Sequence, residues 1–104
     1  MPLYHETHFK DIFMKTAIMH LERKELDTFC DLLPEPIIAR PILVAARGLG
    51  LTLVLEFDGQ RVELIEDALP LRFCSIDAVM FELDGVPNLD KSNILIETKS
   101  YWQH

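Results

Sequence analysis

Residues 51–65 read LTLVLEFDGQRVELI, and two of their features predict the same strand register. These features are a turn in the middle of the segment and the alternation of apolar and polar residues on both sides of it. Asp58-Gly59 is the strongest short signal for a β-hairpin, because the favoured two-residue turn needs positive φ at both central residues. The turn predicts three cross-strand pairs on one face: Phe57–Gln60, Leu55–Val62 and Leu53–Leu64. That face gathers six apolar side chains: Leu51, Leu53, Leu55, Phe57, Val62 and Leu64. On the other face Glu56 pairs with Arg61, and a slip of one residue would turn the apolar set toward water.

The length and composition of the chain are those of one ordinary folded domain. At 104 residues it is long enough for one modest core and short for two conventional domains, so we expect a single domain over residues 1–104. An apolar fraction of 49% with 26% charged residues lies far from the composition of disordered chains.

The formal charge of −7 is unevenly distributed. Residues 1–50 contain six basic and seven acidic side chains, whereas residues 51–104 contain four basic and ten acidic ones. Nucleic acids and anionic membranes attract clustered lysine and arginine, and the sequence has no such run. We therefore expect no nucleic-acid partner and no membrane partner.

Cysteine usage and the first residues predict a cytoplasmic protein. The two cysteines, Cys30 and Cys74, are far apart, and we interpret both as reduced, buried and used as small hydrophobes. Residues 1–6 lack the basic and then apolar pattern of a signal peptide. The most apolar window, residues 41–57, is interrupted by Arg47, Gly48 and Gly50 and is short for a spanning helix.

The N-terminal half predicts two helices. In residues 7–23 the apolar positions recur at three- and four-residue steps, as in an amphipathic helix: Phe9, Ile12, Phe13, Ala17 and Leu21. A second helix over residues 26–33 ends before Pro34 and Pro36. All four residues 22–25 are good helix formers, so the two helices are either continuous or separate, and the shift in apolar phase favours a break.

The C-terminal half predicts more strands. Residues 37–47 are either a short helix opened by Pro41 or an edge strand, and we favour the extended form. Residues 68–70 indicate a turn, 71–75 a crossing segment, 79–84 a third strand, 85–90 a loop, and 94–99 a fourth strand that Tyr101-Trp102 extends. The expected fold is α+β, with one or two N-terminal helices packed on one face of a four- to five-stranded, mostly antiparallel sheet.

The outer face of that sheet receives one acidic residue from each predicted strand: Glu56, Glu63, Glu82 and Glu97. This pattern indicates either an anionic platform for a basic partner or a cationic ligand, or an ordinary solvated face, partly neutralised by Arg61 and Lys99. The same face also carries Val54, Ile65, Met80 and Leu95. A second protomer or residues 37–47 would cover these side chains, unless they are scattered surface hydrophobes.

Motifs for catalysis and metal binding are weak. His5-Glu6-Thr7-His8 has its histidines three apart, whereas the zinc protease motif needs four. Gly48-Leu49-Gly50 precedes a strand and lacks the lysine of a phosphate-binding loop. We therefore predict no catalytic residue, no cofactor and no metal ligand.

Two functions of different class follow from these patterns. The first is a small, acidic, non-catalytic interaction protein that forms a homodimer or another homo-oligomer and holds a basic protein through its sheet face or edge. Its predicted partner-binding residues are Glu56, Glu63, Glu82, Glu97, Met80 and Leu95. The second is a small-molecule-binding or enzymatic domain with an apolar pocket between the first helix and the sheet. Its predicted lining residues are Phe13, Met14, His20, Phe57, Phe73 and Phe81, with His20 as the acid/base candidate.

Overall fold

The computed structural model describes residues 19–103, and over these residues the fold is mixed α+β. In chain order the elements are β1 (Met19–Glu22), the 3-10 turn η1 (Arg23–Glu25), α2 (Leu26–Asp31), β2 (Arg40–Ala46), β3 (Gly50–Phe57), β4 (Gln60–Glu66), β5 (Leu69–Pro70), β6 (Arg72–Phe73), α3 (Ile76–Leu83), β7 (Leu95–Glu97) and α4 (Lys99–Trp102). Seven strands form one sheet in this part of the chain, which is more than the four or five expected.

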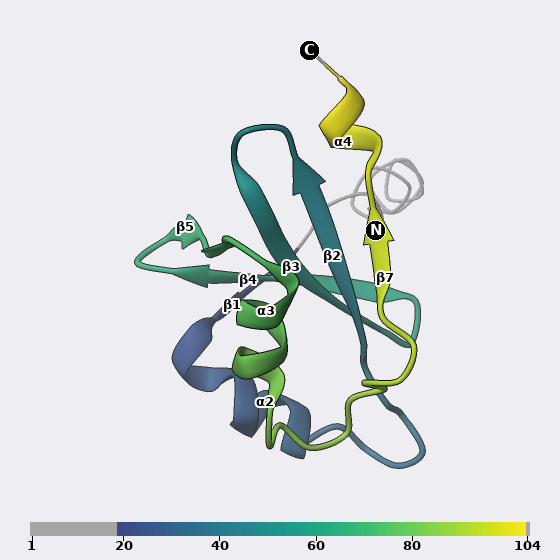
Figure 1. Cartoon of the computed structure of the whole chain (residues 1–104). Coiled ribbons are helices and arrows are strands. Elements are labelled where there is room, and N and C mark those ends of the chain that lie inside the picture. Colours follow the sequence, from purple (N-terminus) through teal and green to yellow (C-terminus); the bar gives the residue numbers. More distant parts are fainter. Residues whose placement is uncertain (1–18, 104) are drawn as a thin grey trace, which may run out of the picture.

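The sheet has the strand order β1-β4-β3-β2-β7 (Figure 1). Its centre is antiparallel, whereas both outer pairs, β1 with β4 and β2 with β7, are parallel. The short strands β5 and β6 pair with β4 and β3. The sheet is therefore mixed, with antiparallel pairing concentrated around β3.

The hairpin predicted at Asp58-Gly59 is confirmed. Both turn residues have positive φ, 49° and 76°. The ladder between β3 and β4 runs from Phe57–Gln60 to Val54–Glu63 and includes Leu55–Val62 and Glu56–Arg61. Leu53 and Leu64, beyond the end of this ladder, are buried in the same apolar cluster.

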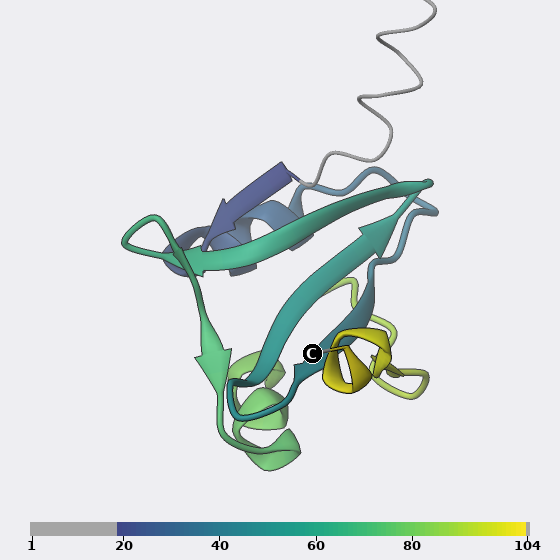
Figure 2. The ribbon, with the colours of Figure 1, turned by 90° about the horizontal axis from the view of Figure 1, so that it is seen from above.

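Two helices contribute side chains to the core beside this hairpin. Leu26 and Cys30 of α2 and Val79 and Leu83 of α3 are buried in one cluster with Leu53 and its apolar neighbours. Figure 2 shows the curved sheet from above, with α4 on the near side. The predicted second helix is confirmed as α2, but α3 comes from the C-terminal half, where the sequence favoured a strand.

The strand predicted over residues 79–84 is wrong, because Ile76–Leu83 forms α3. Ser75 caps this helix, and its Oγ accepts a hydrogen bond from the Ala78 amide at 3.1 Å. Val79 and Leu83, four residues apart, are buried, whereas Phe81 is 84% exposed. Residues 79, 81 and 83 are all apolar and so imitate strand alternation, but burial follows the helical period.

The helix predicted over residues 7–23 is wrong at its end, because Met19–Glu22 forms β1. Leu21 pairs with Leu64 of β4 and is 7% exposed, so its burial comes from a sheet partner far away in sequence. Residues 7–18 lie outside the described part of the chain.

Three further segments differ in detail from expectation. The turn near Pro70 is Asp67-Ala68, with φ of 55° and 67°, and Leu69–Pro70 is the strand β5 that follows it. Residues 71–75 include the strand β6. The fourth strand ends at Glu97, and Tyr101-Trp102 belongs to the helix α4 instead of extending that strand.

The extended conformation favoured for residues 37–47 is confirmed by β2. However, β2 is an inner strand, between β3 and β7. Proline has no N–H to donate to a neighbouring strand. Pro41 is tolerated there because the ladder with β7 begins only at Ile42, so no residue of β7 pairs with Pro41.

No helix within residues 19–103 is long and apolar enough to cross a membrane.

Candidate functional site

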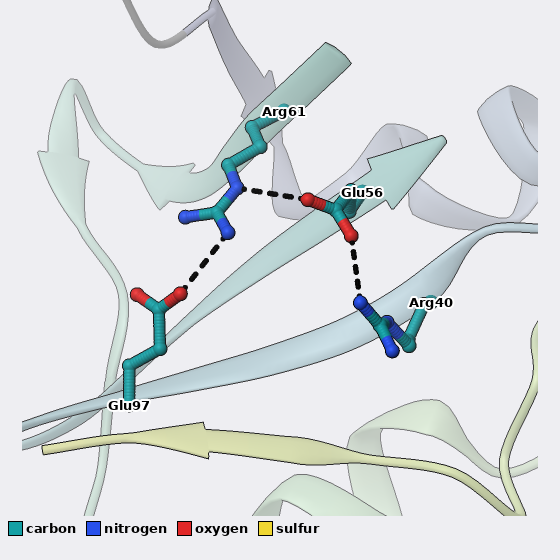
Figure 3. A network of polar contacts seen from close by, with 4 residues as sticks. All are labelled: Arg40, Glu56, Arg61 and Glu97. Atoms are coloured by element: carbon teal, nitrogen blue, oxygen red, sulfur yellow. Dashed lines mark hydrogen bonds and ion pairs between the residues drawn. The ribbon is translucent and has the colours of Figure 1, made fainter. Parts of the chain in front are cut away.

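Arginines and glutamates from four strands form a polar network on one face of the sheet (Figure 3). Arg40 Nη2 donates to Glu56 Oε1 at 3.0 Å. Arg61 donates twice, from Nε to Glu56 Oε2 at 3.2 Å and from Nη2 to Glu97 Oε2 at 3.0 Å. Arg61 therefore joins β4 to β7 across the two strands that separate them.

The contact between Arg61 and Glu97 requires a strongly coiled sheet. Arg40, Glu56 and Arg61 share one row, and Glu97 lies opposite Val44, four positions further along β2. In a flat sheet, three strand spacings and four residues would separate the Arg61 and Glu97 Cα atoms by about 20 Å, beyond the reach of the two side chains. In Figure 1, β4 runs across the direction of β2, as such coiling requires.

Two buried apolar side chains lie in the row between Glu56 and Glu97. Ile42 and Val54 are opposite each other in the β2–β3 ladder, and they are 0% and 2% exposed. The Arg61 side chain crosses this row to reach Glu97, and the stem of an arginine covers apolar surface while its guanidinium meets an anion. The face that the sequence predicts to be either an anionic platform or an ordinary solvated surface therefore contains buried apolar side chains between its charged residues.

The arginines favour the ionised form of the Glu56 carboxylate. The pKa of Glu56 is lowered, first by the hydrogen bond from Arg40 and then by Arg61, against the opposing effect of desolvation. The pKa of Arg61 is raised, chiefly by its hydrogen bond to Glu97. Since the side chains of all four residues are about a third exposed, each pair contributes modestly to stability.

The six predicted partner-binding residues do not share one face. Glu56, Glu63, Glu97 and Leu95 belong to the polar face, where Glu63 Oε1 lies 3.8 Å from Nε2 of His20. Glu82 belongs to α3 and accepts hydrogen bonds from Arg23 at 2.7 and 2.9 Å. Met80, also in α3, packs against the core. The prediction that these two lie on an outer strand is wrong, because their segment is helical.

The residues predicted to line an apolar pocket do not converge where the structure describes them. Phe57 contacts Phe29 edge to face at a centroid distance of 5.3 Å, and Phe73 is buried in the core. Phe81 is 84% exposed on α3, and His20, beside Glu63, has a side chain that is 59% exposed. Phe13 and Met14 lie outside the described residues.

The two cysteines differ in environment, and both are free thiols. Cys30 is buried in α2, and burial, with a smaller contribution from Asp27, raises its pKa to about 11. Cys74 is exposed, so the prediction that it is buried is wrong; it follows β6 at the start of the turn into α3. Within residues 19–103 no group of three His, Cys, Asp or Glu side chains is placed to hold a metal ion.

Aromatic rings and a guanidinium meet where α4 approaches the turn between β2 and β3. The Arg47 Cζ atom lies 4.9 Å from the ring centroid of Tyr101 and 5.6 Å from that of Trp102. The two rings contact each other edge to face at 4.9 Å. This is cation–π geometry, and it attaches α4 to the β2–β3 turn although no residue of α4 is buried.

Two more cations and an exposed leucine belong to the same region. Arg72 Nη1 of β6 donates to the backbone oxygen of Leu49 at 3.4 Å, and Lys99 is the first residue of α4. Leu49 is 55% exposed and Trp102 is 64% exposed. We call this surface the basic corner; its residues are Arg47, Leu49, Arg72, Lys99, Tyr101 and Trp102.

The basic corner is locally cationic in a chain of net charge −7. Its residues come from the β2–β3 turn, β6 and α4, and the stretches of sequence around them, residues 39–55, 68–76 and 98–103, contain no aspartate or glutamate. Among residues 19–103, Arg47, Arg72 and Lys99 have no carboxylate within ion-pair distance. The three segments are far apart in sequence, so a charge count over each half of the chain does not reveal them. The sequence signal for this surface is that all three segments lack acidic residues.

No family model, no curated protein and no solved structure matches this chain.

Proposed function

We propose that this chain is a non-catalytic protein-interaction domain that binds an acidic segment of a partner protein at the basic corner. The observation that carries the proposal is the arrangement of Tyr101 and Trp102 against Arg47, with both Arg72 and Lys99 nearby and with Trp102 left 64% exposed. Tryptophan, tyrosine and arginine are the residue types that most often dominate binding energy at protein interfaces.

The polar contacts of the corner suit an acidic partner. Arg72 binds a backbone oxygen and Arg47 lies against two rings, so both guanidiniums are held in place without neutralisation of their charge by these contacts. A carboxylate arriving from a partner would add a charge-assisted hydrogen bond to a group that is already oriented. Cations at such a rim also accelerate association with an acidic surface.

The ionisable groups of the sheet and core support a binding role better than a catalytic one. Arginines lower the pKa of Glu56 and hydrogen-bond to Glu97, and the Cys30 thiol is buried with a raised pKa. A general base works best with a pKa near the operating pH, and a nucleophilic cysteine needs a lowered pKa. These groups therefore act in structure and packing.

A basic partner at the sheet face and a homo-oligomer, both expected from the sequence, stay predictions. Because Arg40 and Arg61 already occupy Glu56 and Glu97, a basic partner there would have to displace internal ion pairs. The basic corner requires no such displacement from an acidic partner, and we therefore favour it.

The fluorescence of Trp102 tests the proposal, because it is the single tryptophan of the chain. Oligoglutamate is titrated into the protein at low ionic strength, and oligolysine and an oligothymidylate are titrated separately. We expect saturable changes in Trp102 emission with oligoglutamate that weaken as salt is added. Oligolysine is expected to leave the emission unchanged.

A matched pair of charge reversals locates the site. Lys99→Glu lies in the basic corner, and Lys91→Glu makes the same charge change at an exposed lysine in the loop before β7. We expect Lys99→Glu to weaken oligoglutamate binding at least several-fold and Lys91→Glu to change it little. Equal effects of the two variants, or tighter binding of oligothymidylate than of oligoglutamate, would contradict the proposal.

A further inference from the structure

We propose, resting on the function above, that the acidic segment bound at the basic corner belongs to a second copy of this chain, so that copies associate head to tail. The segment consists of α2 and the loop after it, residues 27–38. Its sequence, DTFCDLLPEPII, contains three carboxylates and no lysine or arginine. We call its exposed acidic and large aliphatic residues the acidic end: Asp27, Asp31, Leu32, Glu35 and Ile38.

The acidic end and the basic corner lie at opposite ends of the molecule. Figure 1 shows α2 and the loop after it at the bottom, with the β2–β3 turn and α4 at the top. The strand β2 connects the two, because Arg40 follows the acidic end and Ala46 directly precedes Arg47. Seven strand residues span about 23 Å. One copy therefore cannot close its own acidic end on its own basic corner, whereas two copies can stack end to end.

The two surfaces are complementary in charge and in apolar character. The acidic end has three carboxylates, and the basic corner has three cations. Asp27 and Asp31 are four residues apart and so lie on one side of α2. Both surfaces also expose large apolar side chains: Leu32 is 73% and Ile38 57% exposed at the acidic end, against 55% for Leu49 and 64% for Trp102 at the corner. Burial of these side chains would add a hydrophobic contribution to the ion pairs.

Head-to-tail contact between copies predicts the symmetry of the assembly. In head-to-tail association each copy uses its acidic end on one neighbour and its basic corner on another, so the contact is heterologous, and repeating it gives a ring or an open chain of copies. A two-fold dimer, by contrast, would use one surface twice. Association through exposed charges should also weaken with ionic strength, because screening shortens the range of the attraction.

Sedimentation velocity tests the proposal on the full chain across a range of concentrations. At low ionic strength we expect the average mass to rise with concentration beyond a dimer, and at high ionic strength we expect it to fall toward the monomer. A sample that stays monomeric at all concentrations would overturn the proposal. If oligoglutamate still changes Trp102 emission in that sample, the proposed function stands and only the second copy fails.

A mixing experiment with charge-reversed variants separates head-to-tail contact from a two-fold dimer. One variant carries Arg47→Glu and Lys99→Glu at the corner, and the other carries Asp31→Lys and Glu35→Lys at the acidic end. We expect each alone to associate at least ten-fold more weakly than the natural chain. The equimolar mixture is expected to recover a 1:1 complex, because the intact acidic end of the first variant meets the intact corner of the second.

Failure of the mixture to associate, while the natural chain does, would overturn the head-to-tail contact. Self-association of either variant at the strength of the natural chain would also overturn it, because a two-fold dimer that uses a single surface needs only one of the two ends. Circular dichroism and thermal unfolding confirm that the variants fold. The single exchanges Lys99→Glu and Glu35→Lys, both at exposed positions, provide a second pair for the same mixing test.

Discussion

The core beside β3 and the corner at the end of β7 are held in place by different kinds of interaction. In the core, α2 and α3 bury leucine, valine and cysteine side chains against the sheet. Near the corner, no residue of β7 or α4 is buried. Besides the backbone ladder between β2 and β7, the contacts there are polar, such as the Arg61–Glu97 ion pair and the Arg47 cation–π pair. Burial stabilises the first region, while polar attachment of the second leaves Trp102 exposed.

Removal of a core leucine should give the largest effect. Leu53 is fully buried, and Leu53→Ala should lower the free energy of unfolding by about 2–5 kcal/mol through lost burial and the cavity left behind. Leu49→Ala, at the exposed corner, should change it by less than about 0.5 kcal/mol. Urea unfolding monitored by circular dichroism measures both, and equal losses would contradict the difference between the two regions.

The two thiols should react at very different rates. Burial raises the pKa of Cys30 to about 11, which at neutral pH lowers its thiolate fraction at least about 100-fold relative to an exposed cysteine. Cys74 is exposed and should react at once with a chromogenic disulfide reagent. We expect one fast equivalent in the folded protein and two after unfolding. Two fast equivalents without denaturant would show that α2 is not packed as described.

The ion-pair network should contribute less than the core and should do so in a pH-dependent way. Glu56→Gln removes the carboxylate charge and one of the two oxygens that accept from Arg40 and Arg61, and should lower the free energy of unfolding by about 1 kcal/mol at pH 7. Because the pKa of Glu56 is lowered in the folded state, its contribution is complete above the ordinary glutamate pKa of about 4.3. It is lost as the pH falls below that value through the folded pKa.

The natural chain and the Glu56→Gln variant should therefore converge in stability as the pH falls below about 4. Unfolding curves recorded between pH 7 and pH 3 measure this convergence. A difference that stays constant with pH would show that the loss comes from altered packing, and not from the charge of Glu56.

Loss of the Arg61–Glu97 pair should act locally. Glu97→Gln should change the global free energy of unfolding by only about 0.5 kcal/mol, because both side chains are more than a third exposed. The amides of β7 should nevertheless exchange about twofold faster with solvent, while those of β3 keep their protection. Exchange measured by nuclear magnetic resonance tests this, and faster exchange throughout the sheet would contradict a local role.

The smallest expected effect on stability is that of Arg47→Ala. An exposed cation–π pair contributes about 0.5–1 kcal/mol to its own contact, and α4 buries no residue, so global unfolding should shift by only a few tenths of a kcal/mol. The emission of Trp102 should change because a cation leaves its ring face. Arg72→Ala is the control, since Arg72 binds the Leu49 backbone oxygen, and its effect on the emission should be smaller.

The sequence predicted best those segments in which two local signals agree. At Asp58-Gly59 the turn chemistry and the alternation specify the same register, and the β3–β4 ladder follows it. At Val79–Leu83 the apolar residues fit both patterns, because residues 79, 81 and 83 alternate while residues 79 and 83 have helical spacing. The Ser75 cap supports the helix that the structure has. Leu21 is in a strand because Leu64 pairs with it, which no local pattern shows.

The basic corner lay beyond sequence reasoning for a related reason. Arg47, Arg72 and Lys99 are isolated cations in sequence, and each is unremarkable in its own segment. They meet only because β6 pairs with β3 while β7 carries α4 back toward the β2–β3 turn. Likewise, the acidic residues expected to form one platform are divided between the sheet and α3, and most of them have arginine partners.

We propose that an acidic segment binds where Arg47, Tyr101 and Trp102 meet. The most direct measurement follows the backbone and indole N–H signals of the labelled full chain by nuclear magnetic resonance as oligoglutamate is added. We predict that the shifts concentrate at the Trp102 indole and in the β2–β3 turn, β6 and α4. Shifts centred on Glu63 and His20 of the sheet face, or no saturable shift at the Trp102 indole, would contradict the claim.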